Sequence, residues 1–570
     1  AFPNLKRLDL SFSLELIRIH DLYLSPGIEE ILLLGCITLT KVYSSGFLNK
    51  LNSLRLDGCV ELRSLTIPSN ILSRSSALIS LIYCEKLEAF SIPNRTHHEE
   101  EEEEEKCWDN GTASDSKGTF DPVVNIDRHE NEECWLDLYN CKSLTSLSFE
   151  FDLSKLKFLK KLLLDGCYKL KIFPEIEDTM ENLAVLKLDR TAIQALPSSL
   201  CRLVALQELS LHSCASLESL PNSIVNLNLL SVLDCSGCAK LTHIPSDIGC
   251  LSLLRELSLS ESRIVNLPES IAHLSRLELL DLSDCKKLEC IPWLPPFLKQ
   301  LKAFDCQSIT KVMSNSHIQI PLNSKEGGIF KFYFTNGQQL DPGAHANIVD
   351  EARLRMTGDA YRSVFFCFPG SEVPHWFPFR CEGHSITINT GSLNFCSDDR
   401  LIGFALCVIF QLPDTDDIEG IYGSFSHCLK YKSDNGEHIL PNNDNLKNHF
   451  SWTDGRRKLD QDHTFLWKYD LEFQGMSGMS RMLLPRACSF TFEISPYHYD
   501  NYLKRPSFLS IVREIKSTVK VKECGICPLY TKEKDDNNAG TGDYSGSVRF
   551  SKNDIEEPSG SHVAWMEEGL

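Results

Sequence analysis

The sequence predicts an α/β solenoid of stacked repeats, with a parallel sheet on its concave face, followed by an all-β sandwich. An apolar-alternating run recurs with a nearly constant period through residues 1–310. A cysteine or another small residue follows each run at a fixed distance. The block 321–531 loses this period but keeps short alternating segments rich in aromatic and β-branched residues. These three observations carry the fold prediction.

The repeat reads L-x-x-L-x-L-x-x-C, as in Leu206, Leu209, Leu211 and Cys214. Its L-x-L step has the period of a short strand whose leucines point inward. About twelve such units in succession form a leucine-rich repeat array. The central strand residues are spaced 21 to 26 residues apart, except for one step of 57, and are Leu8, Ile31, Leu54, Ile79, Leu136, Leu162, Leu186, Leu209, Leu233, Leu257, Leu280 and Leu301. A second marker keeps the same phase, because apolar-Pro pairs end at Pro174, Pro197, Pro221, Pro245, Pro268 and Pro292.

The recurring cysteines are interpreted as structural. Cys is small, readily buried and a weak S–H donor, which suits a turn inside a narrow solenoid. Thr191 and Ser262, other small donors, take the same position in two repeats, which fits neither disulfides nor metal ligands. The nine turn cysteines are Cys36, Cys59, Cys84, Cys141, Cys167, Cys214, Cys238, Cys285 and Cys306.

Two C-x-x-C pairs raise the alternative of a zinc site. The repeat already explains Cys235 and Cys238, as a strand residue and a turn residue. Cys524 and Cys527 lie nearly 300 residues away in the other region. We therefore expect no metal and no cofactor in this chain.

The step of 57 residues marks an insertion with seven consecutive glutamates. Like charges at this density repel one another and bury little apolar area, so we expect a disordered loop near 95–130. An acidic interaction arm is the alternative. Two glycosylation sequences, at 94–96 and 110–112, matter only if the protein is secreted. The polar, Gly-rich tail 532–570 is also expected to be disordered.

The block 321–531 suggests an antiparallel sandwich of roughly 200 residues. SITIN (385–389) and SFTFEI (489–494) alternate, and FALCVIF (404–410) is continuously apolar. The pattern shows no long amphipathic helix.

Five strings in this block carry a family resemblance: FYFTNGQQLD (332–341), FCFPGSEVPHWF (366–377), GHSITI (383–388), LIGFALCVIF (401–410) and VKECGICPLY (521–530). Together with the repeats, they resemble the C-terminal part of plant intracellular immune receptors. That class carries a Toll/interleukin-1-receptor-like domain, a nucleotide-binding domain and leucine-rich repeats. The resemblance implies a jelly-roll or immunoglobulin-like fold for the last domain. Its most distinctive positions are Pro369, Gly370, Ser371, Glu372, Pro374, Trp376 and Phe377.

Motifs of catalysis are missing from the sequence. It holds no G-x-x-x-x-G-K-[ST] phosphate loop, so the family's ADP/ATP switching and NAD cleavage cannot be assigned to residues of this chain. It also lacks H-E-x-x-H, G-x-S-x-G and H-R-D in a suitable context. His345, His375 and His384 show no spacing of a shared ligand site, and the acidic residues of the strands recur at the repeat period. We therefore expect no enzymatic activity from this chain.

The candidate binding surface is the concave face. Side chains between the strand leucines point outward, and a solenoid presents them as a broad surface suited to a protein partner. Solvated positions without a partner are the simpler interpretation for any single residue. The candidates are Lys161, Asp165, Lys187, Asp189, Glu208, His212, Asp234, Glu256, Asp281 and Phe304.

The function predicted from these features is the ligand-sensing and autoinhibitory portion of a plant disease-resistance receptor. Its partners would be a pathogen effector protein and its own or a partner nucleotide-binding domain, with oligomers formed through upstream domains. The cytoplasm is the expected compartment, with the nucleus as a second one. The main alternative is a stand-alone adaptor or decoy without signalling domains. An extracellular repeat receptor is disfavoured by the missing L-x-G-x-I-P turn and the many thiols.

Composition supports the same class of function. The chain has 570 residues, with 58 Lys and Arg against 78 Asp and Glu and a net charge of −20. This balance argues against binding nucleic acid through a general positive field. No uncharged apolar run reaches the length of about 18 residues that a membrane span needs. No secretory signal is present, although Ala1 in place of Met indicates a fragment or a processed piece.

Deleting residues 95–130 should leave the melting temperature of the protein within a few degrees of the wild-type value. The reason is that a charged loop buries little, and the entropy of loop closure varies slowly with loop length. Thermal unfolding of the two proteins measures this, and a larger drop would show that the segment packs.

Overall fold

The computed structural model describes residues 4–19, 25, 27–42, 50–67, 77–91, 134–148, 156–313, 328–337, 339–357, 361–389, 399–411, 424–434, 436–440, 449–451, 461–471, 487–496 and 520–532. The chain divides into two compact units, unit 1 (1–258) and unit 2 (259–570). The expected disorder of the insertion near 95–130 and of the tail falls outside the described residues, apart from the end of a strand at Lys532.

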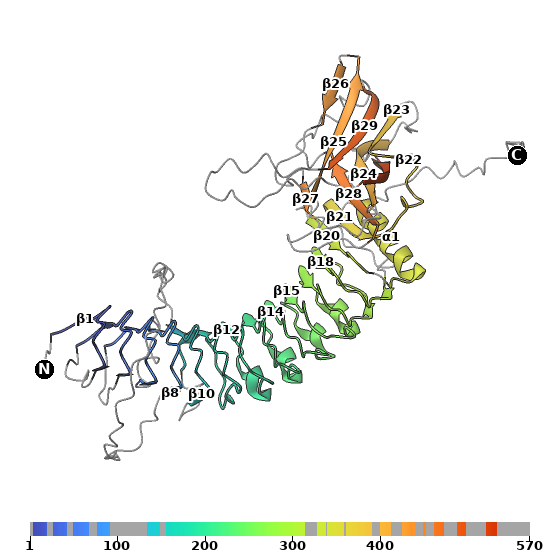
Figure 1. Ribbon diagram of the computed structural model, residues 1–570. Helices are drawn as coiled ribbons and strands as arrows, with labels where there is room; N and C mark the ends of the chain where they lie inside the picture. The colour runs from blue at the N-terminus through green and yellow to red at the C-terminus, as the bar shows by residue number, and fades with distance from the viewer. Residues whose placement is uncertain are drawn as a thin grey trace, which may run out of the picture. The chain divides into compact units, whose positions relative to one another are not determined.

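Unit 1 is a solenoid with a parallel sheet along one face (Figure 1). Adjacent strands align their central apolar residues, as in Leu186 opposite Leu209. The register also passes the insertion, because Ile79 lies opposite Leu136. The predicted period is thereby confirmed. The strands in sheet order are β1 (Arg7–Asp9), β3 (Glu30–Leu32), β5 (Ser53–Arg55), β7 (Leu78–Ser80), β9 (Cys134–Asp137), β11 (Leu159–Leu163), β12 (Val185–Lys187), β13 (Glu208–Ser210), β14 (Val232–Asp234) and β15 (Glu256–Ser258).

The opposite side of unit 1 changes along the array. The N-terminal repeats form a second parallel sheet of short strands, β2 (Arg18–Ile19), β4 (Lys41–Val42), β6 (Ser64–Thr66), β8 (Ala89–Ser91) and β10 (Ser146–Ser148). Later repeats carry 3-10 helices instead: η3 (Ser198–Arg202), η4 (Asn222–Asn226) and η5 (Ile248–Cys250). Pro197 and Pro221 directly precede η3 and η4 with φ near −68° and −67°. Pro favours this start because its φ is fixed and its missing N–H is not needed there.

The turn cysteines join successive repeats. In unit 1 the Cys167 thiol donates to the carbonyl oxygen of Leu138 at 3.3 Å, and the Cys214 thiol donates to that of Leu188 at 3.0 Å. Unit 2 repeats the contact between Cys285 and Leu259 at 3.1 Å. All nine turn cysteines are fully buried and free, which confirms the structural interpretation.

Unit 2 begins with two repeats of the same kind and then changes. Their strands are β16 (Leu279–Asp281) and β18 (Gln300–Lys302), backed by η6 (Glu269–His273), β17 (Cys290–Ile291) and β19 (Lys311–Val312). Two longer strands, β20 (Gly328–Tyr333) and β21 (Tyr361–Pro369), continue the parallel sheet. Phe332 lies opposite Leu301 and Phe366 lies opposite Phe332, so aromatic rings take over the position of the central leucine.

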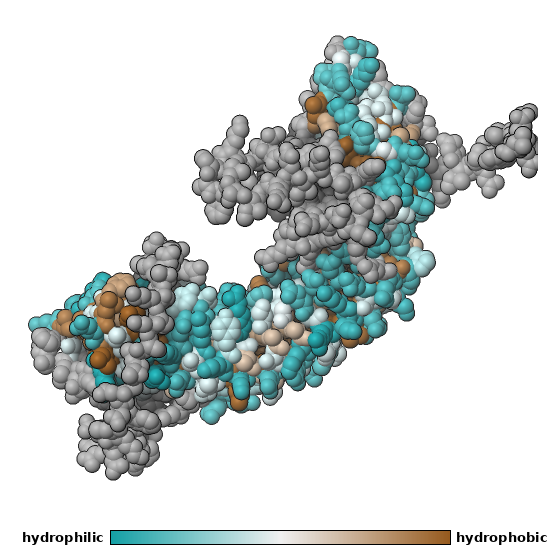
Figure 2. Space-filling view, viewed as in Figure 1, coloured by the Kyte–Doolittle hydropathy of each residue, from teal (hydrophilic) through white to brown (hydrophobic). Residues whose placement is uncertain are grey.

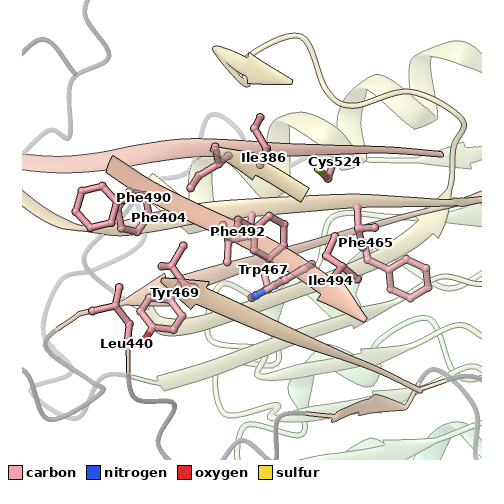
Figure 3. Close-up of a cluster of buried hydrophobic side chains, with 14 of the residues drawn as sticks. Ile386, Phe404, Leu440, Phe465, Trp467, Tyr469, Phe490, Phe492, Ile494 and Cys524 are labelled. Carbon is pink, nitrogen blue, oxygen red and sulfur yellow. The ribbon is translucent and has the colours of Figure 1, made fainter. Parts of the chain in front are cut away.

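The rest of unit 2 is a sandwich of two antiparallel sheets. Strand β21 pairs antiparallel with β28 (His463–Asp470), followed by β24 (Asp399–Gln411), β30 (Lys520–Lys532) and β22 (Phe379–Glu382). The second sheet holds β23 (Ser385–Asn389), β29 (Ala487–Pro496), β25 (Ser424–Ser433), β26 (Gly436–Ile439) and β27 (His449–Ser451). Rings from both sheets meet in the core, among them Phe404, Trp467, Phe490 and Phe492 (Figure 3). The predicted sandwich is confirmed, while its jelly-roll connectivity stays a prediction.

Helix α1 (Pro342–Thr357) is an element that the sequence did not predict. It packs against β19 and β21 and presents only a weak apolar stripe, which explains why no amphipathic pattern was visible. Its buried Arg355 donates to the Glu351 carboxylate at 2.6 Å and to the Tyr361 hydroxyl at 2.9 Å. The guanidinium also lies 3.9 Å from the ring centre of Phe330. The buried charge is therefore both paired and hydrogen-bonded, as its desolvation requires.

The parallel pairing of β18 with β20 spans the expected limit between residues 310 and 321. The sheet is thus continuous where the sequence suggested a boundary between two domains. The predicted limits, 1–310 and 321–531, stay predictions. Among the described residues, no helix has the length and apolar content that a membrane crossing requires.

Replacing Cys214 with Ala should lower the free energy of unfolding by about 1–3 kcal/mol, because the buried carbonyl of Leu188 loses its donor. Cys214→Ser should lower the free energy of unfolding less, since its hydroxyl can still donate to the Leu188 carbonyl oxygen. The matched control is Cys250→Ala, which changes an exposed thiol of the same unit and should stay within about 0.5 kcal/mol. Denaturant unfolding measures all three. An equal loss for Ala and Ser would show that the thiol acts through its volume alone.

Candidate functional site

The concave face of unit 1 brings seven of the predicted partner-binding residues onto the sheet strands and the turns that follow them: Lys161, Asp165, Lys187, Asp189, Glu208, His212 and Glu256. Glu256 is exposed, and the others are half-buried. The Lys187 ammonium pairs with the Glu208 carboxylate of the next strand at 3.0 Å. The ammonium of Lys161 lies 3.9 Å from the ring centre of Trp135 on the preceding strand. These side chains interact along the face rather than projecting singly into solvent.

The aspartates of the face have a structural task that the sequence analysis did not identify. Each repeat strand is only a few residues long, and the backbone N–H three residues beyond its central apolar residue needs an acceptor. Asp165 accepts this bond from Asp189 N at 3.1 Å, and Asp189 accepts the equivalent bond from His212 N at 2.9 Å. Asp234 instead serves its own repeat, by accepting from Ser236 N at 2.9 Å. The carboxylates therefore hold the face in shape, whatever else they bind.

Two of these carboxyl groups are also coupled by charge. Burial, with the neighbouring Asp189 as the second cause, raises the pKa of Asp165 to about 6. Lys187 and Arg190 partly oppose the shift. Asp165 and Asp189 therefore lie at equivalent positions of successive repeats, and Asp165 has a pKa close to neutral pH. Within the described residues, no group of three His, Cys, Asp or Glu could hold a metal ion.

An apolar part of the same face was missed by the sequence analysis. Leu78, Ile82, Tyr83, Trp135 and Tyr139 lie half-buried on β7, β9 and the turns after them; they are called the aromatic patch below. Leu78 is opposite Trp135 in the sheet register, and the Tyr83 and Tyr139 rings meet edge to face with centroids 5.5 Å apart. Figure 2 shows hydrophobic residues gathered over the N-terminal repeats.

A sequence signal for this patch was available. Outward strand positions should be polar where a sheet face meets water. Trp135 and Leu78 break that rule at the position held by Lys161 in the next repeat. Bulky apolar residues at outward positions of adjacent repeats could therefore have pointed to this surface.

The remaining predicted partner-binding residues belong to unit 2. Asp281 accepts from Ser283 N at 3.0 Å and pairs with Lys302 at 3.4 Å. Phe304 stacks on Tyr333, with ring centroids 5.2 Å apart. Both are half-buried on the face of the parallel sheet of unit 2. Their role in binding stays a prediction.

The signature segment Pro369–Phe377 packs against the sandwich. An added Cβ at Gly370 would lie 2.5 Å from the Thr464 hydroxyl oxygen, so a larger residue would have to displace the Thr464 side chain. Val373 and Phe377 are buried over Gly525 of β30. Ser371 and Glu372 are exposed, Pro374 is buried and Trp376 is half-buried. Pro369, Gly370 and Ser371 also line a cavity of about 450 Å³ together with His345, Gln461 and Asp462.

As the pH rises from 4 to 6, the free energy of unfolding should fall by up to about 1 kcal/mol per pH unit, after allowance for solvent screening. The cause is the loss of the proton that folded Asp165 holds. The sign follows because its folded-state pKa of about 6 exceeds the ordinary value of 3.8, so the folded protein binds more protons in this window. Asp165→Asn keeps the acceptor and should flatten this slope. The matched control Asp247→Asn removes an exposed carboxylate and should retain it. Denaturant unfolding over this pH range decides between them.

The chain is similar to known proteins in both its repeats and the block that follows them. The model of the C-JID domain matches residues 368–535. Disease resistance-like protein DSC1 of Arabidopsis thaliana is 30% identical over 431 residues, which is 70% of this chain and 33% of that protein. Disease resistance protein RPS4 of the same plant is 30% identical over 71% of this chain and 28% of that protein. TMV resistance protein N of Nicotiana glutinosa is 28% identical over 72% of this chain and 35% of that protein.

Solved structures give weaker likenesses. The leucine-rich repeat domain of the effector XopL is 22% identical over 32% of this chain and 74% of that chain, with a TM-score of 0.25. A TDR receptor is 17% identical over 59% of this chain and 54% of that chain, with a TM-score of 0.28.

The chain spans about a third of the length of the curated relatives that it matches. Its similarity to them covers about 70% of its own residues and includes both the repeats and the block that follows. The resemblance predicted from the signature strings is confirmed: this is a leucine-rich repeat chain with a C-JID domain, related to the disease resistance proteins of plants.

Proposed function

We propose that this chain is the ligand-sensing portion of a plant disease-resistance receptor and that it binds a pathogen effector protein. Its relationship to resistance proteins supports the class of function. The chain itself would be a binding module rather than an enzyme, with any catalysis belonging to upstream domains. The cytoplasm is the proposed compartment, which suits twenty free cysteines among the described residues.

The aromatic patch is the observation that carries the binding proposal. Trp and Tyr supply most of the binding energy in many protein interfaces, because they bury a large area and lose few rotamers. Trp135 and Tyr139 lie half-buried on a sheet face where solvated positions would be polar. A partner that covers the patch would gain binding free energy by burying these two side chains, and the solenoid would not have to change its conformation.

The charged residues around the patch would orient the partner. Lys161 already rests on the Trp135 ring and offers an ammonium at the edge of the patch. Asp165 and Asp189 are engaged by backbone N–H groups, so they contribute a fixed negative potential rather than adaptable contacts. Electrostatic complementarity of this kind favours specificity and the rate of association more than affinity.

Autoinhibition would use the same chain in a second contact. In the absence of an effector, the repeats and the C-JID domain would hold a nucleotide-binding domain in its inactive state. The effector can shift this equilibrium only by the difference between its affinities for the two states. A surface shared by the effector and the inhibited state would supply that difference directly.

Trp135→Ala and Tyr139→Ala should each weaken effector binding at least tenfold, equivalent to about 1.4 kcal/mol, because each removes a central apolar contact. Lys161→Glu should weaken it less. The matched control is Ile172→Ala, at a side chain that is 71% exposed and lies in unit 1 outside the strands. Circular dichroism would verify the fold of each variant.

The assay joins the chain to upstream domains of a resistance protein and co-expresses candidate effectors in leaves, with cell death as the readout. Effectors that trigger it are then titrated against the purified variants. An effector that still binds Trp135→Ala normally but fails to bind Ile172→Ala would place recognition on another surface.

A further inference from the structure

Two cysteines of unit 2 lie directly opposite each other on neighbouring strands. Cys381 of β22 is the register partner of Cys524 of β30 in an antiparallel pair. Both are free, and they differ in exposure, because Cys381 is exposed whereas Cys524 is fully buried. Cys524 also belongs to one of the two C-x-x-C pairs for which the sequence raised a zinc site.

The two side chains point to the same face of the sheet. Residues opposite each other in a ladder share a face, and the face alternates along each strand. Phe379 and Ile526, the opposite pair two residues away, both pack on the sandwich core. Arg380 of the alternate position instead donates to the Phe377 carbonyl oxygen at 3.1 Å, on the side covered by the signature segment.

The separation of the two backbones suits a covalent link. Gly383 N donates to Lys522 O at 2.9 Å, two residues along in the same register. The pair of Cys381 and Cys524 is therefore of the hydrogen-bonded type, in which the Cα atoms of opposite residues lie about 5.5 Å apart. Disulfides usually join Cα atoms about 4.4–6.8 Å apart. The Cβ atoms of this pair type lie about 5.5 Å apart, beyond the ~3.5–4.5 Å of an unstrained disulfide, so the bond requires a local shift of β22 and would be strained and easily reduced.

We infer that Cys381 and Cys524 form a redox modification site, in which a small-molecule disulfide converts the two thiols into a reversible cross-strand disulfide. The exposed Cys381 meets the oxidant, and the buried Cys524 resolves the reaction. The inference does not rest on the proposed effector binding.

The exchange proceeds in two balanced steps. The Cys381 thiolate attacks one sulfur of the small disulfide, forms a mixed disulfide and releases one small thiol. The Cys524 thiolate then attacks the Cys381 sulfur, closes the cross-strand bond and releases the second small thiol. Two cysteine thiols are oxidised, one small disulfide is reduced to two thiols, and each cysteine proton ends on a released thiol.

Burial raises the pKa of Cys524 to about 12, so the second step should be slow near neutral pH. The thiolate fraction of such a group rises about tenfold per pH unit, and the closing step should accelerate accordingly. This dependence separates closure by Cys524 from a simple surface reaction at Cys381.

The link would tie down the strand that follows the signature segment. Val373 and Phe377 of that segment cover Gly525, the residue next to Cys524 on β30. A bond from Cys524 to β22 would therefore hold the signature segment and the sandwich core together from the opposite side of the sheet. Oxidation should slow hydrogen exchange at the backbone amides of Cys381 and Gly383, which face β30 in the hydrogen-bonded positions of the ladder.

The test treats the full chain with oxidised glutathione at pH 7.0 to 8.5, alkylates the remaining thiols and maps disulfides by mass spectrometry. A peptide joining Cys381 to Cys524 should accumulate, faster at higher pH, and dithiothreitol should remove it. Cys381→Ser should abolish this peptide without unfolding the chain, because the side chain is exposed. The matched control Cys250→Ser, also at an exposed thiol, should leave it unchanged.

Other outcomes would overturn the inference. One is glutathione that stays on Cys381 at every pH without closing onto Cys524. Another is a disulfide that joins Cys381 to a second copy of the chain. A Cys381–Cys524 link that forms only in denaturant would equally exclude a site built into the fold.

Discussion

The hydrogen bond from a turn thiol to a carbonyl oxygen of the preceding repeat is the interaction on which the solenoid depends. A repeat of about 24 residues has a narrow interior, and its turning backbone cannot reach water there. The side chain at this position must be small enough to fit and must still donate a proton. Cys meets both conditions, as Cys167 shows toward Leu138, and Thr191 places a small, buried hydroxyl at the same position in another repeat. A disulfide or a metal would consume the proton that the carbonyl needs.

The same demand for backbone partners shapes the concave face. Its short strands leave an N–H beyond each central apolar residue, and aspartates such as Asp165 and Asp189 accept from it. A surface that looks like a charged recognition site is therefore partly a scaffold. Binding energy has to come from side chains without this duty, and on unit 1 these include Trp135 and Tyr139. Because the residues that support the backbone differ from those available for binding, the binding residues can change without altering the repeat geometry.

In unit 2 the parallel sheet becomes antiparallel through a change in strand length. The repeat strand β18 has three residues, whereas β21 has nine, which exposes a ladder long enough for β28 to pair with it. Phe332 and Phe366 continue the inward column of leucines, so the core remains filled as the spacing changes. The signature segment then covers β30 through Val373 and Phe377. Packing therefore explains the glycine and the apolar residues of this segment. It does not explain the exposed residues Ser371 and Glu372.

Periodicity was enough to predict the repeats, their register and the burial of Cys214 and its equivalents, because each repeat contacts mainly its neighbours and local pattern decides the outcome. Alternation likewise indicated the sandwich strands. Helix α1 was not predicted because its burial depends on β19 and β21 rather than on an apolar stripe of its own. Tertiary structure alone decided that Asp165 accepts from a backbone amide, that Trp135 adjoins Leu78 across a 57-residue step, and that Cys381 faces Cys524. Each of these relations joins residues distant in the chain, and strand pairing, which no local pattern encodes, brings them together.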